Sequence, residues 1–406
     1  LHVARELPGP EATDAVAAEL AQAAVERQVP LLLAIADRAD PKAFPAVLQA
    51  AKSGPAPVRI VAMSVLERIG NASCIPVLLE AALDADAVVA DTAKATLGRL
   101  PGQEADAAVL SGLPQATGKK LQVLVGLAGV RRLAAALPAI VKSAEDADAG
   151  VRAAAVDALG AMGGEAQAAD LVKILQKGQD PKDQPGIEKA LMAISARVGA
   201  ACVRHLNPLA TSEDRSVRAI ALRALVCAGG PDALAIVTAA LSGGDEASQA
   251  EAVRTLSTWP NRWPEDVAVM EPLLAVAKSD RKMAQKILAV RGYVQCVQGA
   301  TKLPEDQKLA KVKDILPALT RPEEKRLAVA ALGALSTPGA LEALAALAAD
   351  TSVAEEACAA IVHFAGKKDL KGVSKEQLRS ALQTAAEKAK AGATRREAEK
   401  RLKALK

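Results

Sequence analysis

A short pattern that recurs along the chain constrains the fold more than any other feature. It reads VRAAAVDALGAMG at residues 151–163, VRAIALRALVCAG at 217–229 and VRIVAMSVLERIG at 58–70. Looser copies begin near Val88, Leu121, Ile187, Ala247, Ala284, Lys325, Val353 and Arg395. Their spacing of roughly 30 to 40 residues is typical of arrays in which one helical unit is stacked many times.

Each copy of the pattern is predicted to be a helix. In residues 151–163 the apolar side chains recur with the i, i+3, i+4, i+7 spacing of one buried stripe. Asp148 suits the start of this helix and Gly163 its end. A second apolar-periodic segment precedes each copy, for example at 74–83, 134–143, 166–177, 232–241 and 340–349.

The two kinds of segment alternate, which predicts about twelve antiparallel helix pairs. The first pair is expected at 12–26 and 30–38, and the last at 374–391 and 394–405. The predicted fold class is therefore all-α, a single α-solenoid over residues 1–406.

Composition supports an array of closely spaced helices. Hydrophobic residues make up 51% of the chain but aromatic residues only 1%. Ala, Leu and Val must then fill the interior, which favours thin layers of helices over a sandwich or barrel. The 406 residues are also many for one globular core, a limit that a repeat array escapes.

The consensus V-R-x-x-A-x-x-A-L-G-x-x-G, preceded by a P-x-L-x-x-L-type helix, resembles HEAT repeats of the bilin-lyase-like subtype. The resemblance covers nearly the whole chain and implies stacked helical hairpins. It says little about function, because such arrays serve many unrelated partners.

Three segments depart from the pattern. Residues 117–132 carry Gly126 and Gly129 inside a predicted helix, so this copy is expected to be degenerate or bent. Residues 178–186 are predicted to form a longer polar loop. Residues 258–264 (TWPNRWP) are placed between helices, with both tryptophans half-exposed, and a long segment follows them up to Ser279.

The end of the chain differs in charge from the rest. Residues 366–406 hold thirteen basic and five acidic residues, a net charge of +8 in a chain whose net charge is +4. We predict a basic C-terminal capping repeat, since a solenoid end needs a polar outer face. The alternative is a basic docking surface for nucleic acid or for an acidic partner.

Arginines recur at one position of the repeat. Arg59, Arg152 and Arg218 share it, and Asp148 and Asp214 stand four residues before the last two. In HEAT-like arrays such residues form a ladder between adjacent repeats, which is one interpretation. The other is that the free edge of this ladder, with Arg223, Arg254 and Arg291, lines the concave face and binds an acidic partner.

The tryptophan segment also has two interpretations. Trp and Arg are enriched at binding hot spots, and Arg262 lies between the two tryptophans. Alternatively, the pair fills an irregular junction between repeats. The residues predicted to bind a partner are thus Arg152, Arg218, Arg223, Arg254, Trp259, Arg262, Trp263 and Arg291.

The sequence shows no catalytic or metal-binding pattern. It contains neither H-E-x-x-H nor G-x-S-x-G nor G-x-G-x-x-G, and it has three histidines. The five cysteines are far apart and are expected to be mostly small buried hydrophobes. No cofactor and no catalysis are predicted, and no run of 18 uncharged apolar residues could span a membrane.

The leading functional hypothesis is a scaffold that binds a protein partner along its concave helical face. Nucleic-acid binding through residues 366–406 is the second hypothesis, although the rest of the chain is slightly acidic and only five aromatic residues exist for base stacking.

The third hypothesis is an accessory module of an enzyme. The TWPNRWP segment and LAVRGYV at 288–294 resemble repeats of large bacterial proteins that join such arrays to sugar-degrading domains, and the repeat subtype suggests a bilin lyase. The start at Leu1, without Met, indicates a processed product or an excised segment that is missing something upstream, and whether this is a catalytic domain stays open. Cytoplasmic and exported locations both stay open.

Overall fold

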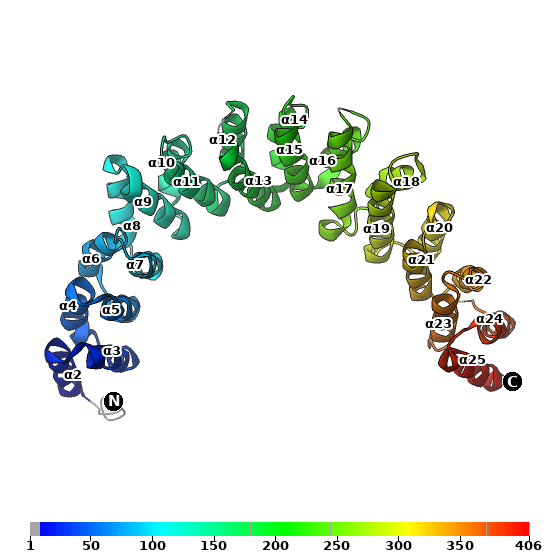
Figure 1. Cartoon of the computed structure of the whole chain (residues 1–406), viewed down its shortest axis with the longest axis horizontal. Coiled ribbons are helices and arrows are strands. Elements are labelled where there is room, and N and C mark those ends of the chain that lie inside the picture. Colours follow the sequence, from blue (N-terminus) through cyan, green and yellow to red (C-terminus); the bar gives the residue numbers. More distant parts are fainter. Residues whose placement is uncertain (1–8, 179, 244, 371, 406) are drawn as a thin grey trace. The chain divides into compact units, whose positions relative to one another are not determined.

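The computed structural model describes residues 9–178, 180–243, 245–370 and 372–405. Within these residues the chain forms helices and no strands, arranged as twelve consecutive helix pairs (Figure 1). The predicted all-α solenoid and its number of pairs are confirmed. The chain divides into two compact units, Leu1–Val198 and Gly199–Lys406. The prediction of one continuous array over residues 1–406 stays a prediction.

In the first unit, each pair consists of a first helix and a second helix. The first helices are α2 (Pro10–Gln22), α4 (Phe44–Ser53), α6 (Ile75–Ala81), α8 (Glu104–Gly112), α10 (Leu137–Ser143) and α12 (Glu165–Gln176). The second helices are α3 (Val25–Arg38), α5 (Ala56–Ile69), α7 (Ala87–Arg99), α9 (Gly118–Val130), α11 (Ala149–Met162) and α13 (Gln184–Val198).

The second unit repeats this organisation. Its first helices are α14 (Val203–Ala210), α16 (Gly230–Ala239), α18 (Met270–Lys278), α20 (Glu305–Ile315), α22 (Pro338–Leu347) and α24 (Lys375–Lys388). Its second helices are α15 (Arg215–Ala228), α17 (Glu246–Arg262), α19 (Met283–Gly299), α21 (Pro322–Ala334), α23 (Ala354–Phe364) and α25 (Gly392–Ala404).

Aspartates fix the starts of several second helices. The carboxylates of Asp86, Asp148, Asp214 and Asp245 each accept hydrogen bonds from two backbone N–H groups of the first turn, in α7, α11, α15 and α17. Such N-caps satisfy donors that the helix itself leaves unpaired. The predicted start of α11 at Asp148 and its end at Gly163 are both confirmed.

Small residues let successive second helices pack directly on one another within each unit. A Cβ atom at Gly129 of α9 would lie 2.7 Å from the Cβ of Ala158 in α11, and one at Gly160 would lie 3.0 Å from the Cα of Ala190 in α13. Gly292 of α19 approaches Ser257 of α17 in the same way.

Successive first helices meet much less than successive second helices do. The second helices therefore form the more tightly spaced row, which is the concave side of each unit.

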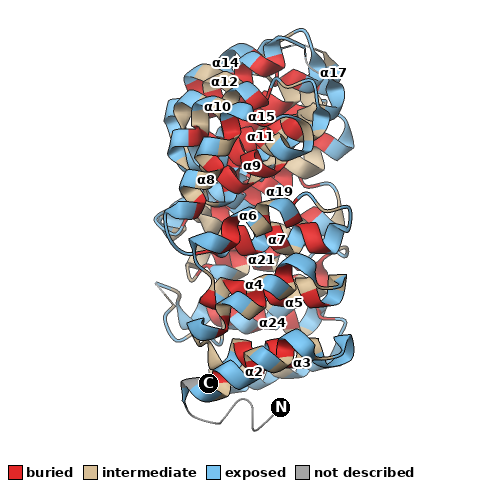
Figure 2. Ribbon diagram, turned by 90° about the vertical axis from the view of Figure 1, so that its left-hand side faces the viewer, coloured by how far each residue is buried: buried red, intermediate tan, exposed pale blue. Residues whose placement is uncertain are grey.

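The core lies between the two rows and is built mainly from Ala, Leu and Val, as the composition predicts (Figure 2). Trp259, Tyr293 and Phe364 are the largest of its fully buried side chains. All five cysteines are buried and free, which confirms their expected role as small apolar residues.

The three departures predicted from the sequence turn out differently. Helix α9 runs without a break from Gly118 to Val130, with Gly129 at a close helix contact, so this copy is a regular helix of the array rather than a degenerate one. Within 178–186, a 3₁₀ turn (Pro181–Asp183) leads into α13 at Gln184, so the expected long loop is largely helical. Helix α17 extends through TWPNR to Arg262, and α18 occupies most of the segment before Ser279.

Two glycines of α9 give a matched test of the close packing. We expect Gly129→Ala to lower the free energy of unfolding by about 1–3 kcal/mol, because the new Cβ collides with the backbone of Ala158. Gly126→Ala should raise it by about 0.5–1 kcal/mol, since nothing lies within 4 Å of a Cβ there and alanine is the better helix former. Urea unfolding measures both, and equal effects would contradict the close contact.

Candidate partner-binding face

A ladder of ion pairs crosses between repeats near the start of the second helices. Arg59 pairs with Asp84 at 2.7 Å, Arg152 with Asp183 at 2.7 Å, and Arg218 with Asp245 at 2.8 Å. The structural interpretation of the repeated arginine is confirmed for these three, and each acidic partner lies between the two helices of the next repeat.

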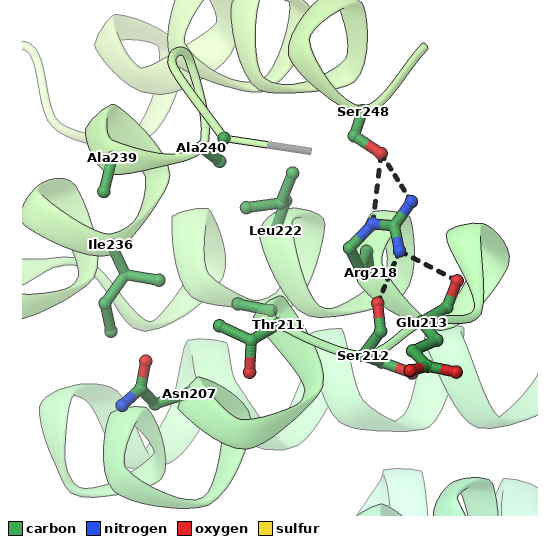
Figure 3. A pocket seen from close by; sticks show the side chains of 12 residues that line it. Asn207, Thr211, Ser212, Glu213, Arg218, Leu222, Ile236, Ala239, Ala240 and Ser248 are labelled. Carbon is green, nitrogen blue, oxygen red and sulfur yellow. Dashed lines mark hydrogen bonds between the residues drawn. The ribbon is translucent and has the colours of Figure 1, made fainter. Parts of the chain in front are cut away.

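All the N–H donors of the Arg218 guanidinium group form hydrogen bonds. Its Nε and Nη2 donate to Ser248 Oγ at 3.0 and 2.9 Å, Nη2 also donates to Asp245, and Nη1 donates to the carbonyls of Ser212 and Glu213 (Figure 3). A guanidinium group has five N–H donors, and all five have an acceptor here. Arg152 likewise donates to the carbonyls of Asp146 and Ala147.

Two aspartates of the ladder, Asp84 and Asp245, have a lowered pKa, which favours their charged form. Backbone N–H donation by Ser248 is the main cause that lowers the pKa of Asp245, and Arg215 and Arg218 add to it. The pKa of Asp84 is lowered first by the N–H of Asp86 and then by Arg59. Each of these carboxylates therefore organises a loop and pairs with an arginine.

A second set of contacts connects the C-terminal ends of successive second helices. Side chains at the end of one second helix donate to the last carbonyls of the previous one. The donors are Arg131 to Leu97 and Leu100, Arg197 to Gly160 and Gly163, Trp263 to Val226, and Lys367 to Gly333 and Leu335. These bonds satisfy carbonyls that a helix C-terminus leaves without partners.

The two tryptophans have different environments. Trp263 is half-buried as predicted, and its indole N–H donates to the Val226 carbonyl at 2.8 Å, the role that arginine or lysine has elsewhere. Trp259 is fully buried in α17, and its N–H donates to Asp266 Oδ2 at 2.9 Å. The expectation that Trp259 is half-exposed in a loop is wrong, because α17 continues through this segment.

Three of the predicted arginines, Arg218, Arg223 and Arg254, come together between α15 and α17. A groove of about 640 Å³ lies there, with apolar residues such as Ala219 and Leu222 on its surface. Arg215 and Arg254 border it, and their side chains are 66% and 62% exposed. We call this the arginine groove; its charged residues are Asp214, Arg215, Arg218, Glu251 and Arg254.

In the arginine groove, the carboxylate of Glu251 is contacted by two arginines. Its side chain is only 11% exposed, its Oε2 accepts from Arg254, and its Oε1 lies 3.7 Å from Arg223 Nη1. Sequence analysis missed Glu251, although its place three residues before Arg254 on a helix was a usable signal. Two arginines thus share one nearly buried carboxylate.

The other predicted residues lie elsewhere. Arg152 belongs to the first unit and is engaged in its ladder. Arg262 is exposed at the end of α17, two turns beyond Arg254. Arg291 is exposed on α19, where it borders a separate hollow of about 410 Å³ with Glu323 and Leu327 of α21.

The first unit has an apolar groove that the sequence did not indicate. It has a volume of about 560 Å³ and runs across α9, α11 and α13. Its residues include Gly126, Val130, Ala154, Ala161 and Ala193, and Val130 is 69% exposed. The small side chains that allow close helix packing also leave this surface hollow.

The thiols are poorly suited to reaction. Burial raises the pKa of Cys296 to about 12 and that of Cys358 to about 11. A thiol with such a pKa forms little thiolate at neutral pH. Among the residues that the structure describes, no group of three His, Cys, Asp or Glu side chains is placed to hold a metal ion. None of the described helices is long and apolar enough to cross a membrane.

Comparison with known proteins gives the repeat type. Residues 117–192 match the HEAT repeats family. The match begins in the segment expected to be degenerate, and the HEAT resemblance is confirmed, while the bilin-lyase-like subtype stays a prediction. None of the curated proteins matches the sequence.

Solved structures of the karyopherin Kap121p share the fold. The structure bound to the extreme C-terminus of the protein phosphatase Cdc14p has a TM-score of 0.60 and 14% identity, and the match covers 99% of this chain and 50% of that one. The structure bound to the SUMO protease Ulp1p has a TM-score of 0.57 and 13% identity, with 97% and 49% covered. The chain therefore spans about half the length of these proteins.

Arg218 can be tested as a structural residue against its exposed neighbour. We expect Arg218→Ala to lower the free energy of unfolding by about 2–3 kcal/mol, because it removes the guanidinium donor of the Ser212 and Glu213 carbonyls and the hydrogen bond to Asp245 Oδ2. Arg215→Ala should change it by less than about 0.5 kcal/mol, since that ion pair is exposed. Urea unfolding and hydrogen exchange of the loop before α15 measure the difference. Equal losses would contradict a structural role for the contacts that Arg218 makes between repeats.

The capping role of Trp263 can be tested by replacing it with arginine, which caps the corresponding helix end in other repeats. Trp263→Ala should lower the free energy of unfolding by about 3 kcal/mol, through lost packing and an unpaired Val226 carbonyl. Trp263→Arg should cost clearly less, because a guanidinium group caps the same helix end in the repeats of Arg131 and Arg197. If the two variants unfold at the same urea concentration, the hydrogen bond contributes nothing and packing alone explains the residue.

Proposed function

We propose that this chain is a protein-interaction scaffold and that the arginine groove, on the concave side of the second unit, binds an acidic segment of a partner polypeptide. The observation that carries the proposal is the pair of exposed arginines, Arg215 and Arg254, on either side of a groove with an apolar floor. Aspartate or glutamate of a partner would pair with them, and its apolar side chains would cover Ala219 and Leu222.

The charges around the groove favour an anionic partner. Four arginines, Arg215, Arg218, Arg223 and Arg254, stand around three carboxylates, Asp214, Asp245 and Glu251. Arg218 is committed to the ladder, and Glu251 serves two arginines. A further carboxylate would therefore complete the local charge balance.

The exposed arginines can change partners at little cost. The Arg215–Asp245 contact of 3.5 Å and the Arg254–Glu251 contact both involve an arginine that is more than half exposed. The exposed Arg215–Asp245 pair contributes about 0–1 kcal/mol. Glu251 is nearly buried, but Arg223 also lies beside it, so Arg254 can turn toward a partner's carboxylate without leaving Glu251 alone. Breaking the Arg218 contacts would instead remove five hydrogen bonds between repeats and loops.

The solved structures with the same fold support a binding role by analogy. In those structures Kap121p is bound to the extreme C-terminus of the protein phosphatase Cdc14p and to the SUMO protease Ulp1p. The likeness concerns the fold, so the partner of this chain is argued from its own groove.

We also propose that residues 366–406 cap the array rather than bind nucleic acid. Among the described residues of α25, Ala398 is the buried one, and the rest of the helix presents mainly charged side chains. Arg401 and Lys400 pair with Glu397 along the same helix. Of the basic residues counted there, Lys371 and Lys406 lie outside the described residues.

Photo-crosslinking combined with charge reversal tests the groove. We expect a photoreactive residue at Ala219, on the groove floor, to crosslink the partner from a native extract, whereas one at Ala235, exposed on α16, should not. Reversing both charges (Arg215→Glu with Arg254→Glu) should weaken binding of the identified partner segment at least about tenfold, and binding should weaken as salt rises.

Arg395→Glu with Arg396→Glu, at exposed positions of α25, is the matched control for charge. Binding that survives the groove variant but is lost in this control would overturn the proposal and make the basic repeat the binding element. Capture of nucleic acid at low salt alone would do the same.

A further inference from the structure

A second cavity lies on the other side of the ladder contact of Arg218 and shares Arg218, Leu222 and Ser248 with the arginine groove. It is an open pocket with a volume of about 460 Å³, at whose surface Asn207 and Ala239 are exposed, and it is bordered by residues of α14, α15, α16 and α17 and by Ala240 and Gly243, which follow α16 (Figure 3). Ala210, Ala239, Ala240 and Gly243 line part of it. These residues are too small to fill the space between two repeats, which is why the cavity exists.

The walls of this cavity are apolar with a polar region at one end. Leu222 and Ile236 form apolar walls, and the side chains of Asn207 and Thr211 project from the end of α14 toward the same space (Figure 3). Thr211 Oγ1 donates to the Pro208 carbonyl, so its oxygen lone pairs can still accept. The Asn207 amide offers both a donor and an acceptor.

Among the described residues that line the cavity, Arg218 is the one cation, and its donors are already used. The guanidinium group of Arg218 has used all five donors on Ser248, Asp245 and two carbonyls. Glu213 lies at the rim, and its carboxylate points away from Ile236 and Ala239 (Figure 3). An anion would meet this carboxylate without a free positive charge, so the lining favours a neutral occupant.

We propose that this cavity binds a small uncharged molecule with an apolar body and one hydrogen-bonding end. Its volume falls within the range of about 300–1,000 Å³ of small-molecule sites, which are mostly apolar with a few polar groups. This volume is also larger than the volume of a single side chain inserted by a partner protein, so a separate small molecule fits the cavity better. The apolar body would contact Leu222, Ile236 and Ala239, and the polar end would lie at Asn207 and Thr211.

The probe for the test is 4-propylphenol, titrated into the whole chain at pH 7 by isothermal calorimetry. Saturable binding with a dissociation constant below about 1 mM is expected. The anion 4-propylbenzoate should bind at least about fivefold more weakly. Absence of saturable phenol binding, or equal binding of the anion, would overturn the proposal.

Two filling variants and a matched control locate the binding. Ala239→Phe should weaken phenol binding at least about tenfold, and Ala240→Leu serves the same purpose if the larger side chain disturbs folding, as judged by circular dichroism. Ala235→Phe, on the same helix but outside the cavity, should bind as the unmodified chain does. If the filling variants bind like this control, the probe sits elsewhere and the site is refuted.

The inference is independent of the proposed scaffold function. Arg215 and Arg254 do not line this cavity, so the charge-reversed groove variant should bind 4-propylphenol with unchanged affinity. A loss of phenol binding in that variant would contradict a separate site.

Discussion

The close approach of successive second helices is the constraint on which the other contacts depend. Glycine or alanine stands at the points of contact, as with Gly129 against Ala158 and Gly160 against Ala190. A larger residue on either side would separate the helices. At this spacing, a single side chain from one repeat reaches the loop or helix end of the next. The ion pairs and the carbonyl caps are therefore consequences of packing between small residues.

The two edges of the second-helix row pair the unsatisfied backbone groups of the helix ends with opposite kinds of side chain. At the N-terminal edge, helix starts need acceptors, and aspartates such as Asp214 and Asp245 supply them while arginines neutralise their charge. At the C-terminal edge, helix ends need donors, and Arg131, Arg197 and Trp263 supply them across the repeat boundary. This explains why positive side chains recur at both edges without forming one binding surface.

Sequence patterns predicted the repeating part of this structure well. The spacing of apolar residues gave the number of helix pairs, and the Asp and Gly positions gave both ends of α11. Patterns failed where the local rule was overridden by packing. Pro260 suggests a helix end, yet α17 continues to Arg262, with Trp259 buried and the backbone N–H of Trp263 bonded to the Trp259 carbonyl. Gly129 suggests weakness within a helix and instead marks its closest contact.

The candidate sites were less accessible to sequence reasoning. The arginine position was recognisable, but only the geometry separates Arg218, whose donors are spent, from Arg215 and Arg254, which are exposed. The cavity behind Arg218 was not predictable, because it depends on small side chains from three separate helices and a loop. A hollow of this kind forms where small side chains of different repeats meet, so it cannot be recognised in any single segment of the sequence.

Arg218 forms part of the wall of both the arginine groove and the cavity behind it, together with Leu222 and Ser248. A substitution there removes a contact between repeats and opens the partition between the two spaces at once. Loss of binding in such a variant would therefore say nothing about which space holds a ligand, or whether Arg218 touches it. Residues that border only one space, Arg254 for the groove and Ala239 for the cavity, separate the effects, because neither belongs to the ladder. In a repeat array the residue that best fits the repeat pattern is thus the least informative about binding, and the residues that break the pattern are the ones that distinguish this solenoid from others.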